Sequence, residues 1–309
     1  KICYGNSRSC SPFILFILLL PGGWVNLDLI NGKTETLNNQ YGQIPMENKH
    51  PEIVLIGAGI MSATMAIFLK ELMPGVCITI FERLHKAAEE SSDAWNNAGT
   101  GHSAFCELNY TSEAADGNID ISKAIKIAAQ FELSKQFWAW LVQQKYISSP
   151  KNFINHVPHI SFVWGDENTA FLKKRFEALT KSKLFEGMQY SEDCDELKKW
   201  MPLVMEGRDQ TEKIAATKMD LGTDVNFGAL TDAMIGHLES LKDVTLYLNH
   251  EVRDLDKEKD GSWERTVKNV LTDDKRKTRA DLIFIGAGGG SLTVLEKSNM
   301  EEAEGEGGS

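Results

Sequence analysis

Residues 52–62 decide the fold, and they read Glu52-Ile53-Val54-Leu55-Ile56-Gly57-Ala58-Gly59-Ile60-Met61-Ser62. A continuous run of β-branched residues and leucine is typical of a parallel strand that is buried on both faces. Gly57 permits the tight turn after this strand, Gly59 lets the backbone approach a pyrophosphate, and Ser62 is small enough for close helix packing. The stretch predicts the strand, turn and helix of a dinucleotide-binding fold, with phosphates at the helix N-terminus near Ile60.

A second strand supports this interpretation. After a helix expected over residues 61–72, the apolar run 76–81 ends at Glu82. An acidic residue at this place accepts hydrogen bonds from a ribose and favours an adenosine without a 2′-phosphate. We therefore expect Glu82 and its neighbour Arg83 in the cofactor site; the alternative for Glu82 is an ordinary surface carboxylate.

The rest of the chain distinguishes FAD from NAD. A simple NAD-binding fold continues with alternating strands and helices. Here a large block intervenes, with a long helix expected over 119–146 and strand material over 153–164. Beyond it, the sequence predicts strands at residues 251–255, 262–271 and 282–285, separated by charged turns, and the last strand ends in glycines. This order predicts a two-lobed flavoprotein in which separated segments hold FAD.

Two further segments are candidates for the cofactor site. Residues 95–103 form a loop rich in small polar residues, whose backbone amides suit a flat ring or an anion. His102 is a candidate flavin contact or proton acceptor, because imidazole titrates near neutral pH; a structural role is the alternative. Val252 is expected beside the adenine, or equally as an inward-facing strand valine. The expected cofactor residues are Gly57, Ala58, Gly59, Ile60, Met61, Ser62, Glu82, Arg83, Asn97, Ala98, Gly99, Thr100, Gly101, Val252, Gly286, Ala287 and Gly288.

Composition narrows the class of protein. The 309 residues are 42% hydrophobic and 25% charged, a balance typical of globular proteins. The net charge of −11 makes nucleic acid an unexpected partner, because a phosphate backbone is held by clustered Lys and Arg. Five scattered cysteines without a C-x-x-C pair predict neither disulfides nor a metal site, and they fit a reducing cytoplasm.

The amino-terminal region differs from the rest. Residues 13–20 are an apolar run of eight, too short to span a bilayer, that imitates the core of a signal peptide. Met46 is the first methionine and leads directly into the first strand. We therefore expect residues 1–45 to be an upstream leader or non-native sequence.

Five stretches carry a specific resemblance, and they are 57–64, 90–103, 157–165, 202–208 and 222–228. In sequence and in order, over about residues 50–300, they resemble one known family, the FAD-dependent malate:quinone oxidoreductases. The resemblance implies oxidation of (S)-malate to oxaloacetate in the tricarboxylic acid cycle, with FAD as hydride acceptor and electrons passed to a membrane quinone. It also implies a cytoplasmic protein, peripheral to the cytoplasmic face of the inner membrane.

The resemblance leaves alternatives open. One is another FAD-dependent 2-hydroxyacid or amino-acid oxidoreductase. Another is an inactive, truncated nucleotide-binding fragment, because family members extend beyond this chain. Arg208 and Lys218 are candidate anion contacts, with surface positions as the alternative.

The expected fold class is α/β, with a discontinuous FAD/NAD(P)-binding Rossmann-like domain and an inserted α+β substrate domain. The expected segments are a leader (1–45), the first part of the FAD-binding domain (46–150), the substrate or cap domain (151–225), the return part of the FAD-binding domain (226–298) and a disordered acidic tail (299–309).

Overall fold

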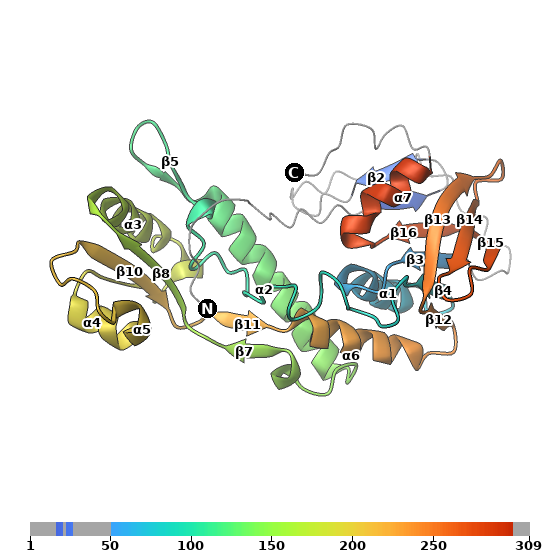
Figure 1. Ribbon diagram of the computed structural model, residues 1–309, viewed down its shortest axis with the longest axis horizontal. Coiled ribbons are helices and arrows are strands. Elements are labelled where there is room, and N and C mark those ends of the chain that lie inside the picture. The colour runs from blue at the N-terminus through green and yellow to red at the C-terminus, as the bar shows by residue number, and fades with distance from the viewer. Residues whose placement is uncertain (1–16, 21–22, 27–50, 299–309) are drawn as a thin grey trace. The chain divides into compact units, whose positions relative to one another are not determined.

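The computed structural model describes residues 17–20, 23–26 and 51–298, which fall into two compact units (Figure 1). Among these residues, unit 1 contains 99–225, and unit 2 contains 51–98 and 226–298 together with the two short amino-terminal segments. The tail expected at 299–309 lies outside the described residues, as does most of the leader expected at 1–45.

Unit 2 is built on a mainly parallel sheet. Its strands in spatial order are β12 (Val244–Tyr247), β4 (Cys77–Phe81), β3 (Glu52–Ile56), β16 (Leu282–Ile285), β1 (Ile17–Leu20) and β2 (Gly23–Asn26). The first four are parallel, whereas β1 and β2 add antiparallel strands beyond β16. The glycine-ended strand expected at 282–285 therefore lies directly beside the first strand, although more than 200 residues separate them in the sequence.

Both faces of this sheet are covered. Successive side chains of a strand point to opposite faces. Val54 and Ile56 of β3 pack in one apolar cluster with Val252, Trp263 and Val267 of the carboxyl-terminal strands. Ile53 and Leu55 therefore point to the other face, where α1 (Ile60–Leu72) contacts β3 and packs against α6 (Phe227–Glu239). Burial on both faces explains why the strand sequence is apolar throughout.

The carboxyl-terminal strands correct one expectation. They form an antiparallel sheet of β13 (His250–Lys257), β14 (Trp263–Asn269) and β15 (Lys275–Ala280), seen side by side in Figure 1. Part of the charged turn expected at 272–278 is thus a strand, paired in register with β14, while 282–285 leaves this sheet for the parallel one. β15 is an edge strand, and the charged side chains that such edges carry conceal it in the sequence.

Unit 1 combines two long helices with small antiparallel sheets. The helices are α2 (Ser122–Gln143) and α3 (Asp166–Leu179), followed by the short α4 (Cys194–Trp200) and α5 (Pro202–Met205). The sheets are β8 (His159–Trp164), β10 (Ile214–Met219) and β9 (Gln189–Ser191); β7 (Ile154–His156) with β11 (Thr223–Val225); and β5 (Ser112–Glu113) with β6 (Ile119–Asp120). The strand material expected over 153–164 is split at Val157-Pro158 into β7 and β8, which belong to different sheets.

The two compact units divide the chain at two points. The chain passes between units near residues 98 and 225. Residues 99–150 therefore group with residues 151–225 in unit 1, and the expected domain boundaries stay a prediction. The physical reason for this grouping is the apolar face of α2, where Ala124 and Ala128 are buried in a cluster with Phe105, Phe185 and Met219.

Candidate cofactor site

The turn after β3 has the geometry expected of a dinucleotide-binding fingerprint. Gly57 has φ +93°, a conformation that side chains beyond glycine rarely adopt. A Cβ added there would lie 2.7 Å from the carbonyl oxygen of Gly286. The turn is fixed on both sides, because the Gly57 amide donates to Phe81 and the Gly286 amide donates to Ile56, each at 2.8 Å. The two glycine-ended strands therefore pack backbone to backbone.

The third position of the fingerprint requires a small residue because it packs closely against the end of β16. Ser62 in α1 is fully buried, and a Cβ on Gly286 would lie 2.2 Å from its Oγ. The close approach of α1 and the end of β16 thus depends on two small residues. By contrast, the nearest described atom to a Cβ on Gly59 is Ser92 Oγ, at an ordinary 3.5 Å. Packing within the described chain therefore does not require glycine at position 59.

Glu82 is held at the end of β4 by the backbone. Its two carboxylate oxygens accept hydrogen bonds from the amides of Ala58, at 2.8 Å, and Leu84, at 2.9 Å. Each carboxylate oxygen has a second lone pair, so the group can still accept a hydroxyl. The acid expected to meet a ribose also ties the glycine turn to the neighbouring strand.

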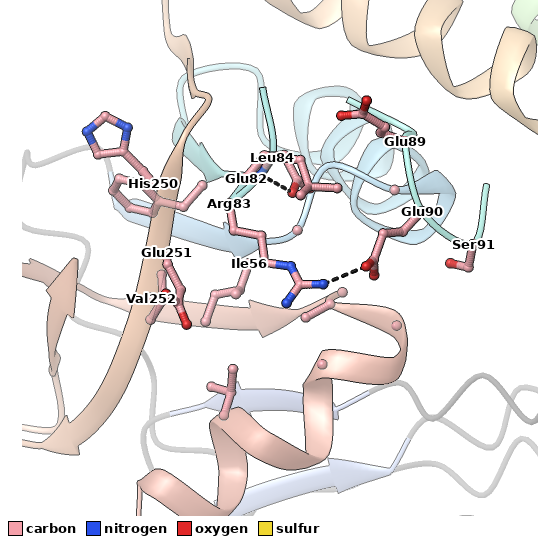
Figure 2. Close-up of a pocket in the computed structure, with 18 of the residues that line it drawn as sticks. Ile56, Glu82, Arg83, Leu84, Glu89, Glu90, Ser91, His250, Glu251 and Val252 are labelled. Carbon is pink, nitrogen blue, oxygen red and sulfur yellow. Dashed lines mark hydrogen bonds and ion pairs between the residues drawn. The ribbon is translucent and has the colours of Figure 1, made fainter. Parts of the chain in front are cut away.

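These groups line one hollow within unit 2 (Figure 2). Eight of the expected cofactor residues lie in its wall: Gly57, Gly59, Glu82, Arg83, Val252, Gly286, Ala287 and Gly288. Figure 2 shows the Arg83 side chain extending toward Glu90, with which it forms an ion pair of 2.5 Å. His250, Glu251 and Val252 approach from β13, so the strand that returns late in the sequence completes the hollow.

Other expected cofactor residues lie near the hollow but not in its wall. Ala58 and Ser62 are buried beneath the turn, and Ile60 and Met61 begin α1. The Ile60 amide donates to Ser92 Oγ at 3.2 Å. Asn97 lies in the same unit, and its side-chain amide donates to the Ser91 carbonyl at 3.2 Å.

The glycine-rich part of the 95–103 loop is more ordered than expected. Gly99, Thr100 and Gly101 belong to unit 1, where they run antiparallel to β11. The Gly101 amide donates to the Thr223 carbonyl, and the Val225 amide donates to Gly99. The Gly101 amide is therefore engaged in strand pairing and does not face a flat ring or an anion. A Cβ on Gly101 would lie 2.0 Å from Thr223 Oγ1, so close strand packing accounts for this glycine.

His102 also lies in unit 1, where its Nδ1 is 3.3 Å from the Tyr110 hydroxyl and 3.5 Å from Glu107 Oε1. Arg208 and Lys218 occupy structural positions in the same unit. Arg208 lies over the Phe162 ring and pairs with Glu212, and Lys218 pairs with Asp220 at 2.8 Å.

Sequence reasoning missed three groups. Ser92 accepts from the first amide of α1, yet nothing in the sequence distinguishes it from its neighbour Ser91. Lys297 of α7 (Ser291–Lys297) lines the hollow and has no ion-pair partner in the part of the chain that the structure describes. Glu107 approaches His102 from the segment between two recognised elements. A spacing of five residues between a histidine and an acid is too common to have drawn attention.

The family is decided by comparison with known proteins. The family model described as malate:quinone oxidoreductase (Mqo) matches residues 49–309. The chain belongs to the malate:quinone oxidoreductase family. A family member from Flavobacterium johnsoniae, described as a probable malate:quinone oxidoreductase, is 61% identical over 257 residues, which cover 83% of this chain and 52% of that protein. A Pseudomonas aeruginosa protein with the description "probable malate:quinone oxidoreductase 1" is 57% identical over 262 residues, covering 84% and 50%. This family member spans about half the length of the curated relatives it matches.

Solved structures establish the fold of this malate:quinone oxidoreductase family member. Glycine oxidase from Geobacillus kaustophilus superposes with a TM-score of 0.59 at 13% identity, covering 80% of this chain and 58% of that one. L-α-glycerophosphate oxidase from Mycoplasma pneumoniae, whose structure has FAD bound, gives 0.50 at 15% identity, covering 77% and 52%. The fold is the α/β, Rossmann-like fold of FAD-dependent oxidoreductases. Across the described ranges, no helix has the length and apolar character that crossing a membrane requires.

Proposed function

We propose that the protein carrying this chain oxidises (S)-malate to oxaloacetate, with FAD as the hydride acceptor, and passes the electrons to a membrane quinone. The observation that carries this proposal is the family match over residues 49–309, which includes every residue that lines the hollow in unit 2. The same match supports a place in the tricarboxylic acid cycle and peripheral attachment to the cytoplasmic face of the inner membrane.

The hollow fits the adenosine and pyrophosphate part of FAD. Packing leaves room at Gly59, where a phosphate would approach the N-terminus of α1, and that helix has no acidic residue in its first turn. Glu82 would accept from the ribose hydroxyls, and Val252 would lie against the adenine. When bound, FAD supplies a two-electron acceptor for the hydrogen at C2 of malate.

In this proposal one unit binds the cofactor and the other contains the substrate or cap domain. Unit 2 holds the cofactor, since the residues that line the hollow all belong to it. Residues 151–225 of unit 1 form the substrate or cap domain. Their small antiparallel sheets carry none of the residues in the hollow wall.

Flavin and substrate measurements test the proposal separately. The purified 309-residue chain is expected to retain FAD, seen as a flavin absorption spectrum, and (S)-malate is expected to bleach that spectrum. A quinone analogue should then restore the flavin absorption spectrum. The same measurements on this chain joined to the remaining half of the Flavobacterium johnsoniae relative test the full-length architecture. A hybrid protein without flavin would overturn the cofactor assignment, and a flavin that malate does not bleach would overturn the substrate assignment.

Glu82 offers a specific test of the cofactor site. Glu82→Ala removes the acceptor for two backbone amides and the proposed ribose contact. Hydrogen bonds to a charged group are worth about 1.5–3 kcal/mol, so FAD affinity should fall roughly 10- to 100-fold. Fluorescence titration of the apoprotein with FAD measures this. Glu239→Ala, at the exposed end of α6, is the matched control and should bind FAD as the parent chain does.

A further inference from the structure

A buried carboxylate lies beside His102 in unit 1. Glu107 Oε1 is 3.5 Å from His102 Nδ1, and the Glu107 side chain is only 12% exposed, whereas that of His102 is 42% exposed. Both carboxylate oxygens are buried, and no side chain in the described ranges makes a hydrogen bond to them, so the approach of His102 is an ion-pair contact. The acid is therefore the inner member and the imidazole the outer member of a pair.

Glu107 remains charged in this place. Burial by itself raises the pKa of Glu107, but the nearby His102 imidazole, the backbone amide of Glu107 and the charge of His159 together outweigh burial and hold the pKa below its usual value of 4.5. A carboxylate carries negative charge and can only accept hydrogen bonds, so it favours the tautomer whose proton lies on the ring nitrogen that faces it. That nitrogen is Nδ1.

The second neighbour of Nδ1 is compatible with this arrangement. The Tyr110 hydroxyl lies 3.3 Å from Nδ1 and can either donate or accept. Burial, followed by the negative charge of Glu107, raises the pKa of Tyr110, so the phenol keeps its proton. With Glu107 present, Tyr110 accepts from Nδ1–H; without Glu107, Tyr110 can donate to a bare Nδ1 instead.

A buried arginine fixes the segment that carries Glu107. Arg175 of α3 has no exposed surface, and its guanidinium donates to the carbonyls of Ala104, Phe105 and Glu107 and to the Thr111 hydroxyl, at 3.1–3.4 Å. Five hydrogen bonds from one rigid group to four acceptors hold residues 104–111 in one conformation. The position of the Glu107 carboxylate is therefore set by α3 and does not depend on a free loop.

We infer that Glu107 is the positioning residue for His102: its carboxylate keeps the proton on Nδ1 and leaves Nε2 as the proton acceptor of the ring. Nε2 has no hydrogen-bond partner among the residues described. The inference rests on the proposed function, in which the hydroxyl proton of malate needs an acceptor.

Charged and titratable groups around the pair come from several elements. His159 of β8 is 8% exposed; its Nε2 donates to the Thr223 carbonyl at 3.0 Å, and its Nδ1 is buried without a partner in the described chain. Arg175 adds a positive charge behind Glu107, and Lys123 of α2 lies 5.1 Å from the centre of the Tyr110 ring. Cys106 neighbours Glu107 along the chain.

Nitrogen-15 NMR of the histidine-labelled 309-residue chain tests the inference directly. His102→Gln identifies the His102 signals by their loss. The parent chain at mildly alkaline pH is expected to show a protonated Nδ1 and a bare Nε2 at His102. In Glu107→Leu the major form should change to Nε2–H, because Tyr110 is then free to donate to Nδ1. Glu113→Gln, an exposed carboxylate paired with Lys174, is the control and should leave the tautomer unchanged.

Two results would overturn the inference. The first is a parent chain in which His102 carries its proton on Nε2. This result is obtained without any variant, so it does not depend on a variant that folds. The second comes from the Glu107 side: carbon-13 titration of its carboxyl should show a higher pKa in His102→Gln than in the parent, and equal values would contradict the pairing. Neither measurement involves FAD or malate. A chain that fails to oxidise malate would therefore refute the proposed function. The tautomer of His102 would still be decided by the NMR measurements alone.

Discussion

Gly57 shows how backbone conformation and packing can require the same residue. Its φ of +93° disfavours any side chain, and the space where a Cβ would lie is occupied by the backbone of Gly286 and Ala287. A backbone neighbour cannot rotate away as the end of a side chain can. A side chain at position 57 would therefore be destabilising both through backbone strain and through this close contact.

Gly57→Ala is expected to lower the free energy of unfolding of unit 2 by about 1–3 kcal/mol, the cost of a side chain held in a left-handed conformation, and more if β3 and β16 separate. Urea unfolding followed by circular dichroism measures the change. Gly236→Ala is the control, because a Cβ added to this exposed position of α6 would meet no described atom within 4 Å beyond the surrounding backbone of the helix itself. Alanine should stabilise that helix by about 0.5–1 kcal/mol. Equal effects of the two substitutions would contradict the packing described for Gly57.

The pKa of Glu107 predicts how the stability of unit 1 depends on pH. Its value in the folded protein lies below the usual 4.5, so the folded state binds fewer protons than the unfolded state in that range. The contribution of Glu107 to stability is complete above the unfolded pKa and is lost as the pH falls through the folded value.

The comparison of the parent chain with Glu107→Gln between about pH 6 and pH 2 isolates this group from other carboxylates. The parent should lose more stability than the variant as the pH falls, and the two curves should converge at the acid end. Parallel curves over the whole range would show that Glu107 has no such linkage.

Residue-level prediction from the sequence is limited to roles that are local. Gly57 and Ser62 were assigned from the fingerprint spacing, because a strand, a turn and a helix that are consecutive in sequence determine what each position must be. Glu107 could not be assigned this way. Its role depends on Arg175 and His159, which lie far along the chain and meet it only after α3 and β8 have packed.

At the scale of elements, α3 depends on one buried cation. Burial lowers the pKa of Arg175 to about 10, still above neutral, so the guanidinium is charged among the carbonyls it bonds. A buried charge is tolerated when its donors are satisfied, and here they hold the 104–111 segment against the helix.

Arg175→Met is expected to destabilise unit 1 by about 3 kcal/mol or more, because several buried carbonyl oxygens lose their donor at once and each costs about 1–3 kcal/mol. Hydrogen exchange should show the loss first in residues 104–111. The neighbouring Lys174→Met removes an exposed cation paired with Glu113 and should change stability by less than about 1 kcal/mol. Unaltered exchange in residues 104–111 of the Arg175 variant would contradict the role of the Arg175 hydrogen bonds in holding this segment.

Elements were predictable from sequence where burial is one-sided or complete. The apolar strands β3 and β4 and the helix α1 lie within a few residues of their expected positions. The expected 119–146 helix is shorter, Ser122–Gln143, and β15 was taken for a turn. β15 has one buried side chain, Ala280, so its pattern carries almost no hydrophobic signal. Its strand character comes from backbone bonds to β14, which composition does not reveal.

At the scale of the whole molecule, cofactor binding should be confined to one unit. The residues that line the hollow are drawn from unit 2, at four separate places in the sequence: 56–59, 81–92, 250–252 and 286–297. A ligand that binds only the folded form stabilises whatever structure it contacts.

Hydrogen exchange with and without FAD is therefore expected to show protection in these four segments together. Residues 150–200 of unit 1 serve as the internal control and should exchange at the same rate in both samples. Protection confined to unit 1 would contradict the assignment of the hollow to the cofactor.

The pairing of β16 with β3 has a consequence for synthesis. Within the described residues, unit 1 is one continuous stretch, so all of it is available once residue 225 has left the ribosome. The core sheet of unit 2 is not, because β3 at residue 52 must wait for β16 at residue 282. During that interval an apolar strand lacks one neighbour, the situation in which nascent chains recruit chaperones. The slow step in the biogenesis of this protein is thus expected to be closure of the sheet by a strand made more than 200 residues later.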